Sequence, residues 1–327
     1  MNMYIKYCLL ATLLLVIVLV VSCRKPEETP TYITELTTVP IANLSVTSIT
    51  AGGTIVTEGG DEIIRRGVCW DTIPNPVITD SHLDDGKKES GNFVMDVSGL
   101  RPGTKYFIRA FVVVMNDTVY GNEQTFNTKI ADKQGNLYNT VTIGSQVWMA
   151  ENLRVTRYNN GDSILTTSAD FFEEIDPKYQ WVQNNDELNA ATYGRLYTWF
   201  IVEDNRGVCP AGWHVPVMSE FDTLKAYLGG ENLAGSKLKE AGTDHWNSPN
   251  TGANNESGFN ALGGGYVTIH GAFVSLGVTT YFWSSEEDTY NDNTWGMGYG
   301  LYYNNKQFVW GGYYRATGKS IRCIRDY

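Results

Sequence analysis

Two cysteines and a histidine in the second half of the chain have side chains suited to covalent chemistry. Cys209 and His214 lie together within Gly207–Pro216, and an imidazole beside a thiol can activate it as a nucleophile. Cys323, close to the C-terminus, offers another chemistry, because an isolated cysteine pair in an exported domain is typical of a disulfide. We expect a Cys209–Cys323 disulfide and a structural role for His214, since an oxidised cysteine cannot attack a substrate.

Oxygen-bearing side chains are densest between residues 286 and 295. A calcium ion takes about six to eight oxygen ligands, and a single loop often supplies several of them. Glu287, Asp288 and Asp292 are therefore candidate Ca²⁺ ligands, and we expect no other cofactor. A solvated acidic loop is the alternative explanation of the same residues.

Aromatic residues crowd the segment between residues 281 and 314. Aromatic faces stack on sugar rings and anchor protein interfaces. We expect some of these rings to be buried in the core. Because side chains alternate between the two faces of a strand, others should face solvent. The candidate ligand-binding residues are Trp295, Tyr299, Tyr302, Trp310 and Tyr313.

One helix and a set of strands are expected to position these groups. Ser219 is predicted to cap the helix, with Asp222 at its third position, in a capping-box pattern. A turn is predicted over residues 304–306, because Asn-Asn-Lys separates two aromatic-rich runs. The strands predicted in this part of the chain cover residues 299–303, 307–310 and 319–325.

Composition and charge limit the classes of function. The chain has 327 residues, of which 42% are hydrophobic, and this share is sufficient for folded cores in more than one domain. Its net charge of −11 and its lack of a basic cluster argue against a nucleic-acid partner. We expect no enzymatic activity, because the sequence lacks a phosphate-binding loop, a zinc-protease motif and a nucleophile elbow.

The N-terminus has the pattern of an export signal. Lys6 precedes an apolar run over residues 8–21, which is too short for a comfortable membrane span. The Val-Val-Ser-Cys sequence ending at Cys23 resembles a bacterial lipobox, in which the cysteine is lipidated after cleavage. We therefore expect a signal peptide over 1–22, a tether over 23–30 and attachment to the outer membrane, at the cell surface, through lipid on Cys23.

Residues 31–129 read as an all-β sandwich of short strands between turns. Leu100–Tyr106 resembles the tyrosine corner of fibronectin type III domains, in which a tyrosine hydroxyl bonds to upstream backbone. The resemblance implies a fibronectin III-like domain, and we expect this domain to act as a spacer or as a minor binding module. Cys69 has no second cysteine in this domain, so we expect a buried free thiol.

Residues 130–327 contain a series of motifs that point to one family: Ile143–Leu153, Tyr193–Trp199, Cys209–Pro216, Gly258–Leu262 with Gly264–Tyr266, Tyr281–Ser285 and Ser320–Asp326. Together they resemble the Fibrobacter succinogenes major paralogous domain of surface lipoproteins. That family is similar to C-type-lectin-like and formylglycine-generating-enzyme-like folds, so the resemblance implies an α+β, C-type-lectin-like domain. It does not carry enzymatic activity across, because the two cysteines here are better placed for a structural bridge.

These observations predict a cell-envelope lipoprotein with a non-enzymatic binding or adhesion role. The membrane is its first partner, through the lipid, and an extracellular glycan or protein is the expected ligand of the C-terminal domain. The alternative function is that of a structural subunit in a fimbria-like surface assembly.

Overall fold

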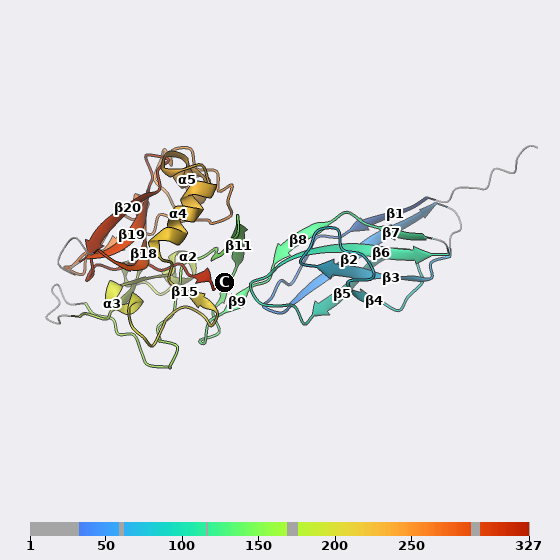
Figure 1. Ribbon diagram of the computed structural model, residues 1–327, viewed down its shortest axis with the longest axis horizontal. Coiled ribbons are helices and arrows are strands. Elements are labelled where there is room, and N and C mark those ends of the chain that lie inside the picture. The colour runs from blue at the N-terminus through green and yellow to red at the C-terminus, as the bar shows by residue number, and fades with distance from the viewer. Residues whose placement is uncertain (1–32, 59–61, 116, 169–175, 289–294, 327) are drawn as a thin grey trace, which may run out of the picture.

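The computed structural model describes residues 33–58, 62–115, 117–168, 176–288 and 295–326. The predicted signal peptide and tether, Cys23 and Asp292 lie outside these ranges. Figure 1 shows an elongated molecule in which an N-terminal domain and a C-terminal domain lie end to end. Within the described ranges, no helix combines the length and the apolar character needed to cross a membrane.

The N-terminal domain is built from two antiparallel sheets, as its alternating strands predict. The first has the order β1-β2-β5, and in the second, of order β4-β3-β6-β7, β6 also pairs with β8. A single apolar core lies within this domain. The strands are β1 (Ile33–Thr38), β2 (Ser48–Glu58), β3 (Arg65–Asp71), β4 (Ser81–Asp84), β5 (Gly91–Ser98), β6 (Lys105–Val114), β7 (Asp117–Tyr120) and β8 (Gln124–Asn127).

Two local predictions for this domain are confirmed. The Tyr106 hydroxyl accepts a hydrogen bond from the Arg101 backbone N–H at 3.0 Å, which is the bond expected of a tyrosine corner. Cys69 is a buried free thiol, and burial raises the pKa of its thiol to about 12. Because a thiol with so high a pKa is protonated at neutral pH, Cys69 packs as a small apolar group.

The C-terminal domain contains a six-stranded sheet of order β13-β14-β21-β18-β19-β20 and a four-stranded sheet of order β11-β12-β22-β15. Two strand pairs, β9 with β10 and β16 with β17, are the remaining sheets among the described residues. The strands are β9 (Ile130–Ala131), β10 (Leu137–Tyr138), β11 (Thr140–Ile143), β12 (Gln146–Met149), β13 (Gln180–Val182), β14 (Arg195–Tyr197), β15 (Trp213–His214), β16 (Tyr266–Val267), β17 (Phe273–Val274), β18 (Thr279–Glu287), β19 (Trp295–Tyr302), β20 (Val309–Tyr314), β21 (Lys319–Ser320) and β22 (Ile324–Arg325).

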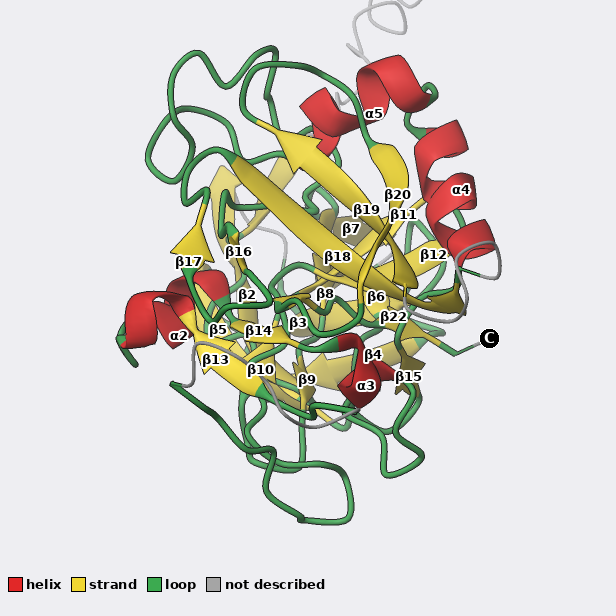
Figure 2. Ribbon diagram, turned by 90° about the vertical axis from the view of Figure 1, so that its left-hand side faces the viewer, coloured by secondary structure: helices red, strands yellow, loops and turns green. Residues whose placement is uncertain are grey.

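Helices are few and short in the described part of this domain. They are η1 (Gln183–Asn185), α2 (Asn189–Tyr193), α3 (Trp199–Val202), α4 (Met218–Tyr227) and α5 (Glu231–Leu238). Figure 2 shows α4 and α5 together along one side of the domain. The predicted cap at Ser219 is wrong, because α4 starts after Val217, whose N–H donates to the Glu220 carboxylate at 3.0 Å.

The predicted fold class is wrong for the C-terminal domain. The described residues are 40% strand and 11% helix, and the strands form many small sheets, which excludes an α+β, C-type-lectin-like domain. Glycines are one physical reason for the low helix content. Gly229 and Gly230 end α4 with positive φ angles, and Gly296, Gly298 and Gly300 alternate along β19, where a helix would be destabilised. The N-terminal domain is all-β, but its finer assignment to the fibronectin III fold is not confirmed.

The two largest hydrophobic cores of the described C-terminal domain lie on opposite faces of β18. Phe282 and Trp283 are neighbours on β18, yet Phe282 packs with Phe221 of α4 whereas Trp283 packs in the core that contains the two cysteines. Successive residues of a strand point to opposite faces, so a strand buried on both faces needs a continuous apolar run. This explains the Tyr-Phe-Trp sequence in β18.

The predicted disulfide between Cys209 and Cys323 is confirmed, with 6.0 Å between the two Cα atoms. Cys209 precedes β15, and β15 pairs with β22, which follows Cys323. The predicted continuous strand over 319–325 is instead two short strands, β21 and β22, in different sheets. The chain changes sheets at Ile321–Cys323, where the buried Arg322 side chain donates hydrogen bonds to Asn152.

The two domains meet at the tyrosine-corner loop. The Arg325 guanidinium donates to the carbonyl of Gly103 at 3.0 Å. Gly103 has a φ of 58°, and a Cβ there would lie 2.9 Å from both Ile130 and Trp213. Because L side chains rarely adopt this φ and the space is closed, a glycine is required at the contact. The N-terminal domain therefore rests against the same strand pair that the disulfide joins.

Candidate functional site

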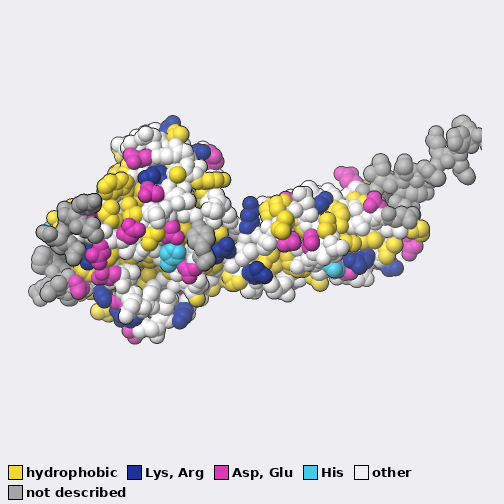
Figure 3. All heavy atoms as spheres, in the orientation of Figure 1, with side chains coloured by type: hydrophobic (Ala, Val, Ile, Leu, Met, Phe, Trp, Pro, Cys, Tyr) yellow, Lys and Arg dark blue, Asp and Glu magenta, His cyan; other side chains and the backbone are white. Residues whose placement is uncertain are grey.

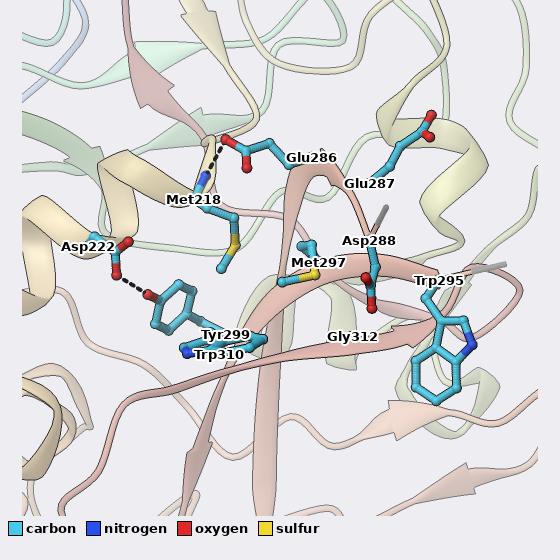
Figure 4. A pocket seen from close by; sticks show the side chains of 10 residues that line it. All are labelled: Met218, Asp222, Glu286, Glu287, Asp288, Trp295, Met297, Tyr299, Trp310 and Gly312. Carbon is cyan, nitrogen blue, oxygen red and sulfur yellow. Dashed lines mark hydrogen bonds between the residues drawn. The ribbon is translucent and has the colours of Figure 1, made fainter. Parts of the chain in front are cut away.

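A pocket of about 620 Å³ opens on the face of the six-stranded sheet beside the first turn of α4. Its volume falls within the range of about 300–1,000 Å³ that is usual for small-molecule sites. We call it the acidic aromatic pocket, and Figure 4 shows the residues that line it: Met218, Asp222, Glu286, Glu287, Asp288, Trp295, Met297, Tyr299, Trp310 and Gly312.

The hairpin of β19 and β20 forms the floor of this pocket. Trp295, Met297 and Tyr299 share one face of β19, because they alternate with glycines that face the other way. The connection between the two strands covers residues 303–308, and β20 runs back antiparallel, so that Trp310 lies opposite Tyr299 and Gly312 opposite Met297. The predicted hairpin is therefore present, but its strands cover 295–302 and 309–314 instead of 299–303 and 307–310. The floor therefore combines indole rings with a flexible thioether.

Gly312 lets the Asp288 carboxylate and the Trp295 ring approach the floor closely. A Cβ at this position would lie 2.6 Å from a carboxylate oxygen of Asp288 and 3.2 Å from the Trp295 ring. Trp310, which is 58% exposed, lies on the same edge strand and presents much of its indole to solvent. Because Gly312 has no side chain and the indole of Trp310 is exposed, the floor presents flat apolar surface to a ligand.

Carboxylates form the rim. Glu286 accepts a hydrogen bond from the Met218 N–H at 3.1 Å, at the start of α4. Glu287 forms an ion pair with Arg315 at 3.1 Å. Asp288 is buried against the floor, and Figure 4 shows its carboxylate between Met297 and Trp295. The space-filling view in Figure 3 shows acidic and apolar side chains next to one another on this domain.

Asp222 forms the wall on the α4 side. It accepts a hydrogen bond from the Tyr299 hydroxyl and pairs with Lys225 at 2.7 Å. Partial burial raises the pKa of the Asp222 carboxyl, but the hydrogen bonds from Lys225 and Tyr299 outweigh this effect and leave the pKa below its usual value. Asp222 is therefore ionised at neutral pH, and Tyr299, although its ring is in the core, has its hydroxyl at the pocket wall.

Three of the five predicted ligand-binding residues, Trp295, Tyr299 and Trp310, line the acidic aromatic pocket. The other two, Tyr302 and Tyr313, do not line it. Tyr313 lies opposite Gly296 and Tyr302 follows Leu301, so both side chains face away from the pocket side of the sheet. The period of two along each strand separates these two groups only with the observed register, because a three-residue turn at 304–306 would have placed Tyr299 opposite Gly311 and turned Trp310 to the other face.

Tyr302 and Tyr313 instead belong to an aromatic cluster around a buried lysine. The Lys319 ammonium lies 4.3 Å from the ring centres of both Tyr281 and Tyr313 and 5.3 Å from that of Trp283. Burial lowers the pKa of Lys319 to about 7, while attraction to the ring faces favours its charged form. Because Lys319 lies between strands of the sheet, we interpret this cluster as structural.

The predicted calcium site stays a prediction. Glu287 and Asp288 line the pocket, but Asp292 lies outside the described residues. Among the residues that the structure describes, no group of three or more His, Cys, Asp or Glu side chains is arranged to hold a metal ion. The alternative of a solvated acidic segment accounts for the exposed Glu286 and Glu287.

The Cys–His pair is not arranged for nucleophilic catalysis, because Cys209 is bonded to Cys323. His214 lies between two carboxylates, with Nε2 at 2.9 Å from Glu220 and Nδ1 at 2.6 Å from Asp326. Burial lowers the pKa of His214, but the two carboxylates outweigh this effect and raise the pKa above its usual value. His214 thus joins the capped start of α4 to the C-terminal segment.

Sequence reasoning missed Met218, Asp222, Met297 and Gly312 as parts of this site. Asp222 was interpreted only as a capping residue, and its carboxylate reaches the pocket because Tyr299, far along the chain, bonds to it. Met297 and Gly312 could have been found from the hairpin register, since they lie opposite one another between the named aromatics.

Comparisons with known proteins identify the C-terminal domain. No curated protein matches the chain. Among solved structures, the sensor domain of the anti-sigma factor RsgI4 from Pseudobacteroides cellulosolvens is 19% identical, with a TM-score of 0.23, over 29% of this chain and 93% of that one. The twitchin kinase region from C. elegans is 10% identical, with a TM-score of 0.20, over 58% of this chain and 34% of that one. The family described as the Fibrobacter succinogenes major domain matches residues 141–325, and the chain belongs to this family.

Proposed function

We propose that this protein is a cell-envelope lipoprotein whose C-terminal domain binds an extracellular glycan in the acidic aromatic pocket. Trp310 is the observation that carries the proposal, because its indole is 58% exposed at the edge of a concave site lined by carboxylates. A large aromatic side chain that is exposed beside a pocket is typical of a ligand-binding site. The proposed role is one of binding and not of catalysis.

The chemistry of the lining suits a sugar. The apolar face of a sugar ring stacks on a flat aromatic surface, and Trp295 and Trp310 supply such surfaces on one side of the hairpin. Carboxylate oxygens accept hydrogen bonds from hydroxyl groups, and such charge-assisted bonds are stronger than neutral ones. Asp222 and Glu286 both lie beside the first turn of α4, where they can orient a stacked ring.

The arrangement of the domains supports a role at the cell surface. The start of β1, which follows the proposed tether, lies at the end of the N-terminal domain that is far from the C-terminal domain (Figure 1). If lipid on Cys23 anchors the chain in the outer membrane, the N-terminal domain holds the pocket away from the bilayer. Several acyl chains on one cysteine give stable anchorage where a single chain does not.

Replacement of Trp310 by alanine tests the proposal. In the detergent-solubilised full chain, a glycan array should identify a ligand, and Trp310→Ala should weaken its binding at least about tenfold in calorimetry, which corresponds to loss of one aromatic stacking contact. Tyr227→Ala is the matched control, because Tyr227 is 65% exposed on α4 and does not line the pocket. A blank array, or equal binding by both variants, contradicts the proposal.

A subunit of a surface assembly is the second candidate function. It is favoured by β20, which is an edge strand of the six-stranded sheet and carries Tyr314 with 52% of its surface exposed. Edge strands are templates for pairing with another chain. Mild cross-linking on cells that recovers copies of the protein joined to one another, without added sugar, would favour the assembly over the glycan receptor.

A further inference from the structure

We infer that the acidic aromatic pocket prefers a sugar that bears a free, protonated amine over the neutral sugar and over its N-acetylated form. This inference rests on the proposed function and specifies the class of glycan. Of the ten residues that line the pocket, four are aspartate or glutamate and none is lysine, arginine or histidine. A neutral sugar needs hydrogen-bond acceptors, but it gains nothing from a lining in which all of the charged side chains are negative.

The cations near the pocket are withdrawn from its surface. Lys225 pairs with Asp222, and its side chain is 17% exposed. Arg315 pairs with Glu287, lies 4.1 Å from the Trp199 ring centre and is 10% exposed. Both positive charges therefore stand behind carboxylates, and a ligand meets the carboxylates first.

Glu286 is the carboxylate best placed to receive a new positive charge. Its side chain is exposed, and its partner is the backbone N–H of Met218, a neutral donor. Within the described part of the chain it forms no ion pair with a lysine or arginine. A ligand amine at this rim would supply the missing countercharge.

The indoles reinforce the same preference. A cation placed over the face of a tryptophan is attracted by the ring, and tryptophan is the best of the aromatic side chains for this contact. Trp295 and Trp310 face the same side of the sheet as the carboxylates that surround them. An aminosugar can therefore stack its ring on one indole while its ammonium group interacts with a carboxylate.

The size of the pocket favours a sugar over a basic protein. A volume of about 620 Å³ suits a small molecule or a few linked sugar rings, whereas a stable protein interface buries about 800 Å² on each partner. Lysine or arginine in a peptide would bring the same charge, so a basic peptide is included as an outcome of the test.

The experiment compares three oligosaccharides of equal length: one of glucosamine, the same oligosaccharide N-acetylated, and the matching one of glucose. Binding to the full chain in detergent is measured at about pH 6, where a free amine is protonated. The glucosamine oligomer should bind about tenfold more tightly than either neutral sugar at about 0.05 M salt, and the advantage should shrink at about 0.5 M salt.

Glu286→Gln tests the assigned carboxylate, because the amide oxygen of glutamine can still accept the Met218 N–H. It should weaken glucosamine binding by about threefold to tenfold and neutral-sugar binding by a clearly smaller factor, because glutamine loses the charge but keeps an acceptor for a sugar hydroxyl. Glu35→Gln is the matched control, since Glu35 is an exposed carboxylate of the N-terminal domain. Loss of the same size in the control overturns the assignment, because it would indicate a general charge effect.

The outcomes separate the two levels of the proposal. Equal or tighter binding of the neutral sugars overturns the amine preference and leaves the glycan-binding function standing. Binding of a lysine-rich peptide without binding of any of the three sugars overturns both, and so does the absence of binding to all four probes. Preferential binding of the glucosamine oligomer that Glu286→Gln abolishes supports both.

Discussion

The Cys209–Cys323 disulfide should supply a large part of the stability of the C-terminal domain. The perturbation is the double variant Cys209→Ala/Cys323→Ala, or reduction of the wild-type protein. The two cysteines are 114 residues apart. In the chain-entropy treatment, closing a loop of that size stabilises the folded state by about 5 kcal/mol, because it restricts the unfolded chain. A loss of this size compares with a total stability of about 5–15 kcal/mol for a typical domain.

Urea unfolding followed by tryptophan fluorescence measures this loss. Trp70 is the only one of the nine tryptophans that precedes residue 130, so fluorescence reports mainly on the C-terminal domain. The midpoint of its transition should fall strongly when the disulfide is reduced, and by a similar amount in the double alanine variant. Cys69→Ala is the matched control, because it removes a buried cysteine of the N-terminal domain without breaking a disulfide.

A loss of less than about 1 kcal/mol in the double variant would refute the entropic reasoning. It would mean that the unfolded chain already keeps residues 209 and 323 close together, or that the two cores hold the domain without help from the bond. Reduction and substitution must agree for the test to be sound, since only substitution removes the sulfur atoms from the core.

Two further predictions concern a charge and a close contact. Because the pKa of His214 is raised in the folded state, its ion pairs stabilise the fold fully below the ordinary histidine pKa and are lost as the pH rises through the folded-state pKa. The wild type should therefore exceed His214→Gln in thermal stability at about pH 5.5, and the difference should vanish near pH 9. The difference should be at most about 1 kcal/mol, because the His214 side chain is 37% exposed. A difference that grows with pH would contradict this sign. Gly296→Ala should cost about 1–3 kcal/mol in urea unfolding, since its Cβ would lie 2.2 Å from the buried Trp199 ring, whereas in Gly311→Ala the nearest contact is 3.1 Å, to the Tyr313 hydroxyl, and the loss should be smaller. Equal losses in the two variants would show that the close contact with Trp199 does not set the cost.

The disulfide and the hairpin were predictable because each depends on a short list of residues. Cys209 and Cys323 are the only cysteines after residue 130, so an exported domain leaves one pairing. The turn predicted at 304–306 lies within the loop that joins β19 to β20, so the antiparallel pairing was predictable, but a three-residue turn would have placed Tyr299 opposite Gly311 instead of Trp310. The acidic and aromatic candidates were therefore placed in the right region of the fold.

The start of α4 and the fold class were not predictable in the same way. The sequence shows one capping pattern, from Ser219 to Asp222, because the valine at position 217 has no side-chain oxygen that could cap a helix. The helix nevertheless starts after Val217, where Glu220 accepts the Val217 N–H and also binds His214, whereas the Asp222 carboxylate is held by Tyr299. These choices depend on residues far apart in sequence, which local propensity does not include.

The disulfide and the acidic aromatic pocket are parts of one connected structure. Cys209 leads through Pro216 to α4, and the carbonyl of Pro216 accepts the N–H of Ser285 at 2.9 Å, at the end of β18 where the acidic rim begins. The next contact along is the hydrogen bond from Met218 to Glu286. The proline-framed segment thus places the first turn of α4 against the rim, so the bond that closes the domain also fixes one wall of the pocket. A binding wall held by such long-range contacts is preformed, which lowers the entropy that a ligand would otherwise lose in ordering it.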